Sequence, residues 1–191
     1  MDVKIAIEKR RAYRSFEPVE ITDDMVKDLA GCANLSASCF NSQPWRFVFV
    51  KGKDALERVF TTISKGNVWA STASMIIAVF SKKEMDYVAT DGRDYYKFDT
   101  GIAVATLILR ATELGLVAHP IAGYDPQKAK ELLGIPQEYD LITLINVGKK
   151  AAVMNPVLSD KQKAGEDIRP ERLPLEKIYS IDAFSPQLNK I

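Results

Sequence analysis

The sequence predicts one domain of the α/β or α+β class, because β-rich apolar runs alternate along it with segments of helical periodicity. Its 191 residues allow a sizeable core, and 47% apolar and 27% charged residues are typical of a globular protein. No apolar run reaches the ~20 residues that a bilayer-spanning helix needs, and Met1–Lys4 carries an early acid. We therefore expect a soluble cytoplasmic protein without a signal peptide or a membrane segment.

Charge and cysteine content exclude several classes of function. The net charge is only +1, so no global field favours nucleic acid or an anionic membrane. Cys32 and Cys39 are not spaced as a CxxC pair, and the only histidine, His119, lies far from both. We expect two reduced cysteines, no disulfide framework and no metal site.

Three helices are expected in the first half of the chain. Residues 2–10 mix apolar and charged side chains as a short helix does. Thr22 is a suitable N-cap for the second helix, and the two following acids suit the positive end of its dipole. The apolar stripe of that helix consists of Met25, Val26, Leu29, Ala30 and Ala33. Residues 53–60 are the third predicted helix.

Four apolar runs predict strands. Residues 47–50 follow Pro44 and read as the first strand. Residues 75–80 form a continuous β-rich apolar run, which indicates a strand buried on both faces. Residues 116–121 and 141–147 are the other two predicted strands, the first short and the second buried.

The segment Phe98–Leu114 has the strongest helical pattern in the chain. It is apolar nearly all round, and Gly115 is suited to end it as a C-cap. A helix that is apolar on all sides must be buried on all sides, so we expect a subunit interface to cover part of it. A polar, irregular region at 82–96 precedes it, and a shorter helix at 126–133 follows it.

After Lys150 the sequence changes to a charged tail with few apolar residues. The tail is punctuated by Pro156, Pro170, Pro174 and Pro186. This composition predicts an extended arm, either disordered or laid across another surface.

Four short segments carry side chains suited to ligand binding. The run Arg10–Arg14 holds three guanidinium groups, which match phosphate oxygens. Asn41–Phe47 offers amide donors and acceptors for the rim of a heteroaromatic ring. Pro120–Tyr124 places Gly123 at a strand end, where the backbone can approach a ligand closely. Taken singly, each segment is better explained without a ligand: the first as a solvated basic face, the second as a polar turn and the third as a strand-to-helix loop. Arg169–Arg172 alone indicates nothing.

Taken together and in this order, the segments resemble the nitroreductase family of FMN-dependent oxidoreductases. The match runs from about residue 5 to about residue 178, through RRxxR, NSQPW, an apolar helix ending in LGL, PIxG, VG and a late R-x-P-like segment. The resemblance implies an α+β fold with a mainly antiparallel central sheet flanked by helices. It also implies an intertwined homodimer with two FMN sites at its interface. Residues 1–150 would form the FMN-binding domain, and 151–191 an arm that completes it and wraps the partner.

The resemblance also implies a set of cofactor-binding residues. These are Arg10, Arg11, Ala12, Arg14, Ser38, Asn41, Gln43, Ile121, Ala122, Gly123 and Arg172. The arginines would hold the FMN phosphate and ribityl chain, with Arg172 reaching from the tail. The polar loop residues would contact the flavin ring, Ser38 and Asn41 that of the partner. Ala122 and Gly123 would present backbone N–H groups to the N5 edge.

Several positions differ from the family pattern. Ala12 stands where the family often has Ser, and Ala37 where it often has Pro. Ala122 replaces a Glu found in some members, and Pro170 a basic residue found in others. These differences bear on cofactor affinity and substrate choice.

The activity implied by the resemblance needs no catalytic acid or base, because the flavin carries the redox chemistry. Electrons would pass from NADH or NADPH through flavin N5 to small electron-poor acceptors, such as nitroaromatics or quinones, in a ping-pong cycle. Within the family, reductive dehalogenation and oxidative breakdown of the flavin are alternatives. A flavin-binding sensor or storage protein with little turnover is the alternative from another class.

Overall fold

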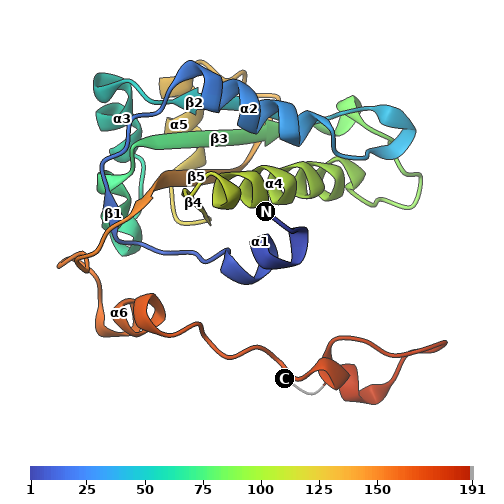
Figure 1. The fold of residues 1–191 in the computed structure, drawn as a ribbon. Coiled ribbons are helices and arrows are strands. Elements are labelled where there is room, and N and C mark those ends of the chain that lie inside the picture. The colour runs from blue at the N-terminus through green and yellow to red at the C-terminus, as the bar shows by residue number, and fades with distance from the viewer. Residues whose placement is uncertain (190–191) are drawn as a thin grey trace.

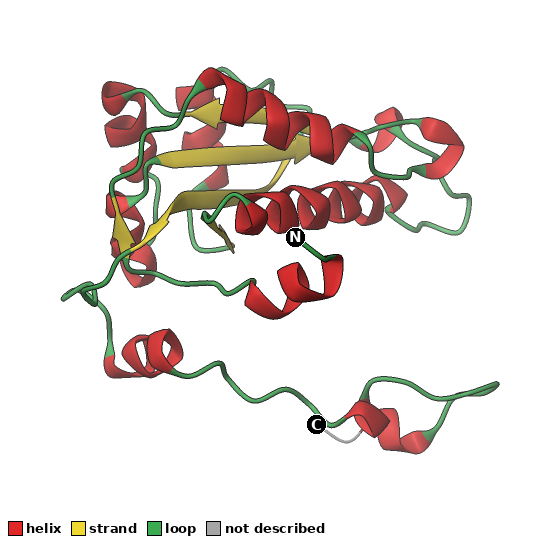
Figure 2. Cartoon of the chain, in the orientation of Figure 1, coloured by secondary structure: helices red, strands yellow, loops and turns green. Residues whose placement is uncertain are grey.

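The computed structural model describes residues 1–189 and is built around one antiparallel sheet (Figures 1 and 2). The strands described are β1 (Phe16–Glu17), β2 (Arg46–Val50), β3 (Met75–Ser81), β4 (Val117–Ile121) and β5 (Asp140–Lys150). Their order is β1-β5-β3-β2, β4 also pairs with β5, and every pairing among the described strands is antiparallel. The predicted antiparallel sheet flanked by helices is therefore confirmed.

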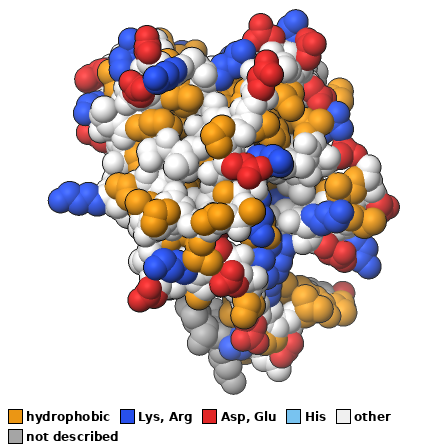
Figure 3. All heavy atoms as spheres, turned by 60° about the vertical axis from the view of Figure 1, so that its left-hand side comes forward, with side chains coloured by type: hydrophobic (Ala, Val, Ile, Leu, Met, Phe, Trp, Pro, Cys, Tyr) orange, Lys and Arg blue, Asp and Glu red, His pale blue; other side chains and the backbone are white. Residues whose placement is uncertain are grey.

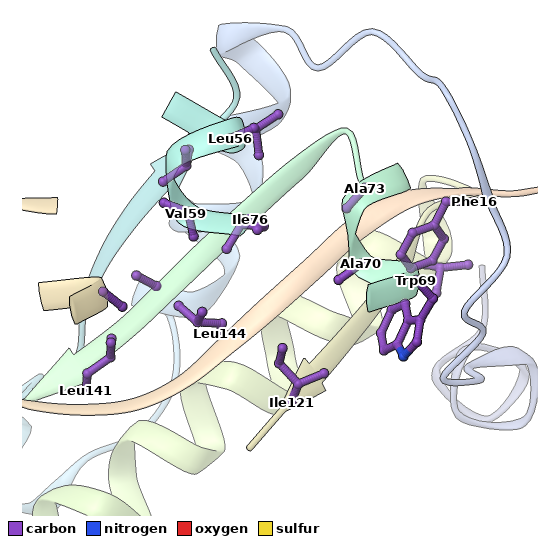
Figure 4. Close-up of a cluster of buried hydrophobic side chains, with 14 of the residues drawn as sticks. Phe16, Leu56, Val59, Trp69, Ala70, Ala73, Ile76, Ile121, Leu141 and Leu144 are labelled. Atoms are coloured by element: carbon purple, nitrogen blue, oxygen red, sulfur yellow. The ribbon is translucent and has the colours of Figure 1, made fainter. Parts of the chain in front are cut away.

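Helices cover both faces of the sheet. The α-helices described are α1 (Val3–Lys9), α2 (Asp23–Asn34), α3 (Lys53–Phe60), α4 (Tyr95–Glu113), α5 (Pro126–Leu133) and α6 (Asp160–Asp167). Helices α2 and α4 pack on one face, while α3, α5 and a 3-10 segment η2 (Lys65–Thr72) pack on the other. Figure 4 shows the core on the α3 side.

Strand β3 explains why its sequence is an unbroken apolar run. Successive side chains of a strand point to opposite faces. Met75, Ile77 and Val79 face the α2–α4 layer, whereas Ile76 and Ala78 face the α3–α5 layer. All five are fully buried, as predicted for a strand covered on both faces.

Helix α4 begins three residues earlier than predicted, inside the region expected to be irregular. Tyr96 is buried, and its hydroxyl donates a hydrogen bond to Asp140. This contact with β5 favours a helical start at Tyr95, although the polar composition of residues 95–97 did not predict a helix there. Within one protomer the outer face of α4 stays open, and Phe98 is 60% exposed.

The arm contains a helix that the sequence analysis did not predict. Helix α6 begins with a capping box in which Ser159 and Gln162 each satisfy the other's backbone N–H. Beyond α6 the arm runs along the outside of the domain in short turns and extended chain (Figure 1).

Across residues 1–189, no helix has both the length and the apolar composition required to cross a bilayer. The same residues hold no cluster of three or more His, Cys, Asp or Glu side chains that could bind a metal. Cys32 and Cys39 are both free thiols.

The sole histidine, His119 on β4, is buried beside Trp69, and the two ring centres lie 4.7 Å apart. Its Nδ1 pairs with the carbonyl oxygen of Tyr13 at 2.9 Å. Burial, with a smaller contribution from the charge of Arg14, lowers the pKa of His119 to about 4, although the hydrogen bond to Tyr13 opposes this shift. The ring is therefore neutral at pH 7.

This burial predicts a loss of stability on acidification. The unfolded chain takes up a proton on His119 near pH 6.5, whereas the folded chain does so only near pH 4. The unfolded state thus binds more protons in this window, and lowering the pH from 7 to 5 should cost about 2 kcal/mol from this group. Urea unfolding at both pH values should show a smaller pH effect in His119→Gln than in wild type. An equal pH effect in both proteins would contradict the assignment.

Candidate functional site

Arginines from the two ends of the chain line one pocket of about 140 Å³. The lining residues are Arg10, Arg11, Ala12, Arg14, Gly165, Arg169, Pro170 and Arg172. On the face drawn in Figure 3, Lys and Arg side chains gather along a recessed band. The first and the last of the sequence motifs therefore meet in space.

Two of these arginines fasten the arm to the domain. The Arg11 side chain donates to the carbonyl oxygens of Gly165 at 2.7 Å and Asp167 at 3.4 Å, at the end of α6. Arg169 donates to the carbonyl oxygens of Glu8 and Arg10, at the C-terminal end of α1. These carbonyls would otherwise lack partners within their helices.

The other three arginines keep their donors available. Among the described residues, the side chains of Arg10, Arg14 and Arg172 take part in no hydrogen bond or ion pair with a protein acceptor. Burial lowers the pKa of Arg10, and the charges of Arg169 and Arg172 lower it further. A bound anion would relieve this crowding of like charge, and guanidinium forks match the oxygens of a phosphate.

Ala122 and Gly123 form the turn that follows β4. The carbonyl oxygen of Gly123 accepts hydrogen bonds from Ser64 N at 3.1 Å and Asn67 Nδ2 at 3.2 Å. A Cβ atom at Gly123 would lie only 2.5 Å from Ser64 Oγ and from Asn67 Nδ2. A larger residue here would therefore force the Ser64 and Asn67 side chains to move. No loop hydrogen bond within residues 1–189 is donated by the backbone N–H of Ala122 or Gly123.

Segment η2 connects this turn to the arginine pocket through Asn67 and Trp69. The guanidinium carbon of Arg14 lies 5.9 Å from the Trp69 ring centre, and the indole also packs against His119 and Phe16. Asn67 and Trp69 both belong to η2, so one short segment contacts the turn at one end and Arg14 at the other. The sequence analysis missed η2, because no spacing or charge pattern distinguishes it.

The remaining predicted segment is the loop that carries Ser38, Asn41 and Gln43. It lies away from the arginine pocket within the protomer. In Figure 1 this loop and α6 are at opposite ends of the molecule. The loop is compact: Ser38 Oγ accepts from Gln43 N at 2.9 Å, and Asp99 accepts from Cys39 N at 2.7 Å. Asn41 and Gln43 have positive φ values of 58° and 49°.

The predicted site residues thus form two separate groups. The arginines, Ala12 and the end of β4, including the buried Ile121, lie on one side of the domain. The loop between α2 and β2, which carries Ser38, Asn41 and Gln43, lies at the far end (Figure 1). One protomer therefore does not assemble the complete set.

Comparisons with known proteins identify the family. The family model described as Nitroreductase family matches residues 7–73 and 64–149. A protein of Thermus thermophilus named NADH dehydrogenase is 22% identical, with 93% of this chain and 95% of that protein covered.

Solved structures agree with this match. A nitroreductase family protein from Clostridium novyi NT is 26% identical, with a TM-score of 0.73 over 80% of this chain and 87% of that one. An oxidoreductase described as containing FMN is 24% identical, with a TM-score of 0.83 over 97% of this chain and 94% of that one. The chain belongs to the nitroreductase family, as the order of its motifs predicted.

Proposed function

We propose that this chain binds FMN and passes electrons from NADH or NADPH to small electron-poor acceptors such as nitroaromatics or quinones. The observation that carries the proposal is the pocket in which three arginines have no protein acceptor, joined through η2 to a turn with available N–H groups. A phosphate at one end and a heteroaromatic ring at the other suit that arrangement. Family membership and the structural neighbour that contains FMN support it.

Arg10, Arg14 and Arg172 are the proposed phosphate ligands. An FMN phosphate carries close to two negative charges, and charge-assisted hydrogen bonds from guanidinium groups match it well. Arg11 lines the same pocket, but its donors already hold α6, so its main proposed role is to fasten the arm. Ala12 contributes no hydroxyl to the pocket.

The turn after β4 is the proposed contact for the flavin ring. FMN, when bound, supplies the hydride-accepting redox chemistry. The N–H groups of Ala122 and Gly123 would orient the ring and stabilise negative charge on it. Ser64 and Asn67 keep that turn in place through Gly123. No acid or base from the protein is required.

A homodimer is proposed because one protomer leaves the site incomplete and its apolar surface open. The large exposed apolar side chains that follow Arg172 on the arm are Leu173, Leu175, Ile178, Tyr179, Ile181 and Phe184. A patch of this kind is typical of an interaction surface. Together with the open face of α4, it favours an arm that crosses a second copy. Ser38 and Asn41 would then reach the partner's FMN.

The phosphate assignment predicts a selective loss of FMN affinity in Arg14→Ala. Loss of one charge-assisted contact, about 1.5–3 kcal/mol, should weaken FMN binding by about one to two orders of magnitude. Riboflavin lacks the phosphate, so its affinity should change far less. Fluorescence titration of both flavins measures the difference. Arg58→Ala, an exposed arginine on α3, is the matched control. An equal loss for both flavins in Arg14→Ala would overturn the assignment.

The dimer predicts a solution mass of twice the chain's 21.3 kDa for the FMN-loaded protein. Phe98→Glu adds a charge to the open face of α4, and we expect it to shift the protein toward the monomer without unfolding it. Light scattering combined with circular dichroism tests both statements. A folded wild-type monomer at micromolar concentration would contradict the proposal.

The enzyme proposal predicts acceptor-dependent turnover. NADH or NADPH oxidation should accelerate when a quinone or a nitroaromatic compound is added, and double-reciprocal plots at several acceptor concentrations should be parallel. A yellow protein that binds FMN but shows no turnover with either nucleotide and either acceptor class would favour the sensor or storage alternative.

A further inference from the structure

The backbone around Arg14 is held by hydrogen bonds from three distant segments. Glu166 of α6 is only 5% exposed, and its carboxylate accepts from Arg14 N at 2.7 Å and from Ser15 N at 3.1 Å. The Ser15 carbonyl oxygen accepts from Ala151 N at 2.9 Å. On the N-terminal side of Arg14, His119 Nδ1 forms a hydrogen bond with the carbonyl oxygen of Tyr13. The Arg14 main chain is therefore fixed on both sides.

A fixed main chain limits where the Arg14 side chain can reach. Its guanidinium lies over the Trp69 ring on one side. On the other side is Gly165, where an added Cβ would lie 3.8 Å from Arg14 Nη1. Glu166 follows Gly165 directly, so the residue that fixes the Arg14 backbone also places the α6 turn against its side chain.

The negative charge of Glu166 is unfavourable for binding an anion in the arginine pocket. A buried carboxylate beside a site for a dianion repels that ligand, since both are negative. Among the described residues, Glu166 forms no ion pair with a pocket arginine, and both its oxygens face backbone N–H groups. Its electrostatic effect is unfavourable for an anion, so a contribution to binding must come through geometry.

We propose that Glu166 is a positioning residue for phosphate binding, which holds Arg14 in its binding orientation through two backbone hydrogen bonds. This inference rests on the proposed FMN function. Because the same carboxylate joins α6 to the 13–15 segment, phosphate binding and docking of α6 also support each other.

Glu166→Gln tests the proposal by the sign of its effect. The substitution removes a negative charge near the pocket, so electrostatics alone would tighten FMN binding. It also turns an amide NH₂ toward a backbone N–H in place of an acceptor, which disrupts the Arg14–Ser15 contact. Positioning therefore predicts weaker FMN binding, and electrostatics alone predicts stronger binding.

The measurement is the affinity of the full-length protein, stripped of flavin, for FMN and for riboflavin. In Glu166→Gln we expect FMN binding to weaken about tenfold or more, and riboflavin affinity to stay within about twofold. The matched control is Glu171→Gln, the same change at an exposed position of the arm, which should leave FMN binding unweakened.

Unchanged or tighter FMN binding in Glu166→Gln would overturn the proposal, and so would an equal loss for both flavins. If this variant does not fold, Glu166→Asp keeps the charge but shortens the side chain. We then expect a several-fold loss confined to FMN, and an unchanged FMN affinity would overturn the proposal. Wild-type protein that binds riboflavin as tightly as FMN would instead overturn the phosphate assignment of the proposed function, and this inference with it.

Discussion

Strand β5 is the element on which the placement of both the arginine run and the turn after β4 depends, because it pairs with the strand next to each of them. Its residues 144–148 pair with β4, and the next two residues, Lys149 and Lys150, pair with β1. The turn after β4 follows Ile121, which pairs with Leu144, and the arginine run precedes Phe16, which pairs with Lys150. The pairing with this one strand therefore fixes how the turn and the arginine run lie relative to each other. Phe16 of β1 packs over Gly148, where an added Cβ would lie 3.1 Å from the Phe16 ring. A Cβ atom at position 148 would therefore require the Phe16 side chain to shift by a few tenths of an ångström.

The pocket arginines divide into two kinds because the structure gives them different partners. Arg11 and Arg169 donate to backbone carbonyls and join the ends of α6 and α1. Arg10, Arg14 and Arg172 face the pocket without a protein acceptor among the described residues. Only the second kind has hydrogen-bonding capacity to offer a ligand. The dense positive charge is tolerable because the pocket is partly open to water, which screens like charges.

Backbone strain is concentrated in the loop that lies far from this pocket. Phe40, Asn41 and Gln43 all adopt positive φ, a conformation that non-glycine residues rarely take. Hydrogen bonds from the loop to Asp99 and within the loop hold this conformation. Phe40 is nonetheless 86% exposed, so the loop presents an ordered surface to something outside the protomer. This is consistent with a site shared between two copies of the chain.

Local signals in the sequence determined most of the secondary structure. Thr22 caps α2, Gly134 ends α5 with φ 66°, and the apolar run at 75–80 forms the buried β3, because each signal acts within a few residues. The order of the short motifs likewise identified the family. Tertiary structure alone decided the start of α4, the docking of α6 and the place of Trp69. It also decided which arginines are free, because Arg14 and Glu166 are 152 positions apart and meet only once the sheet and the arm are in place.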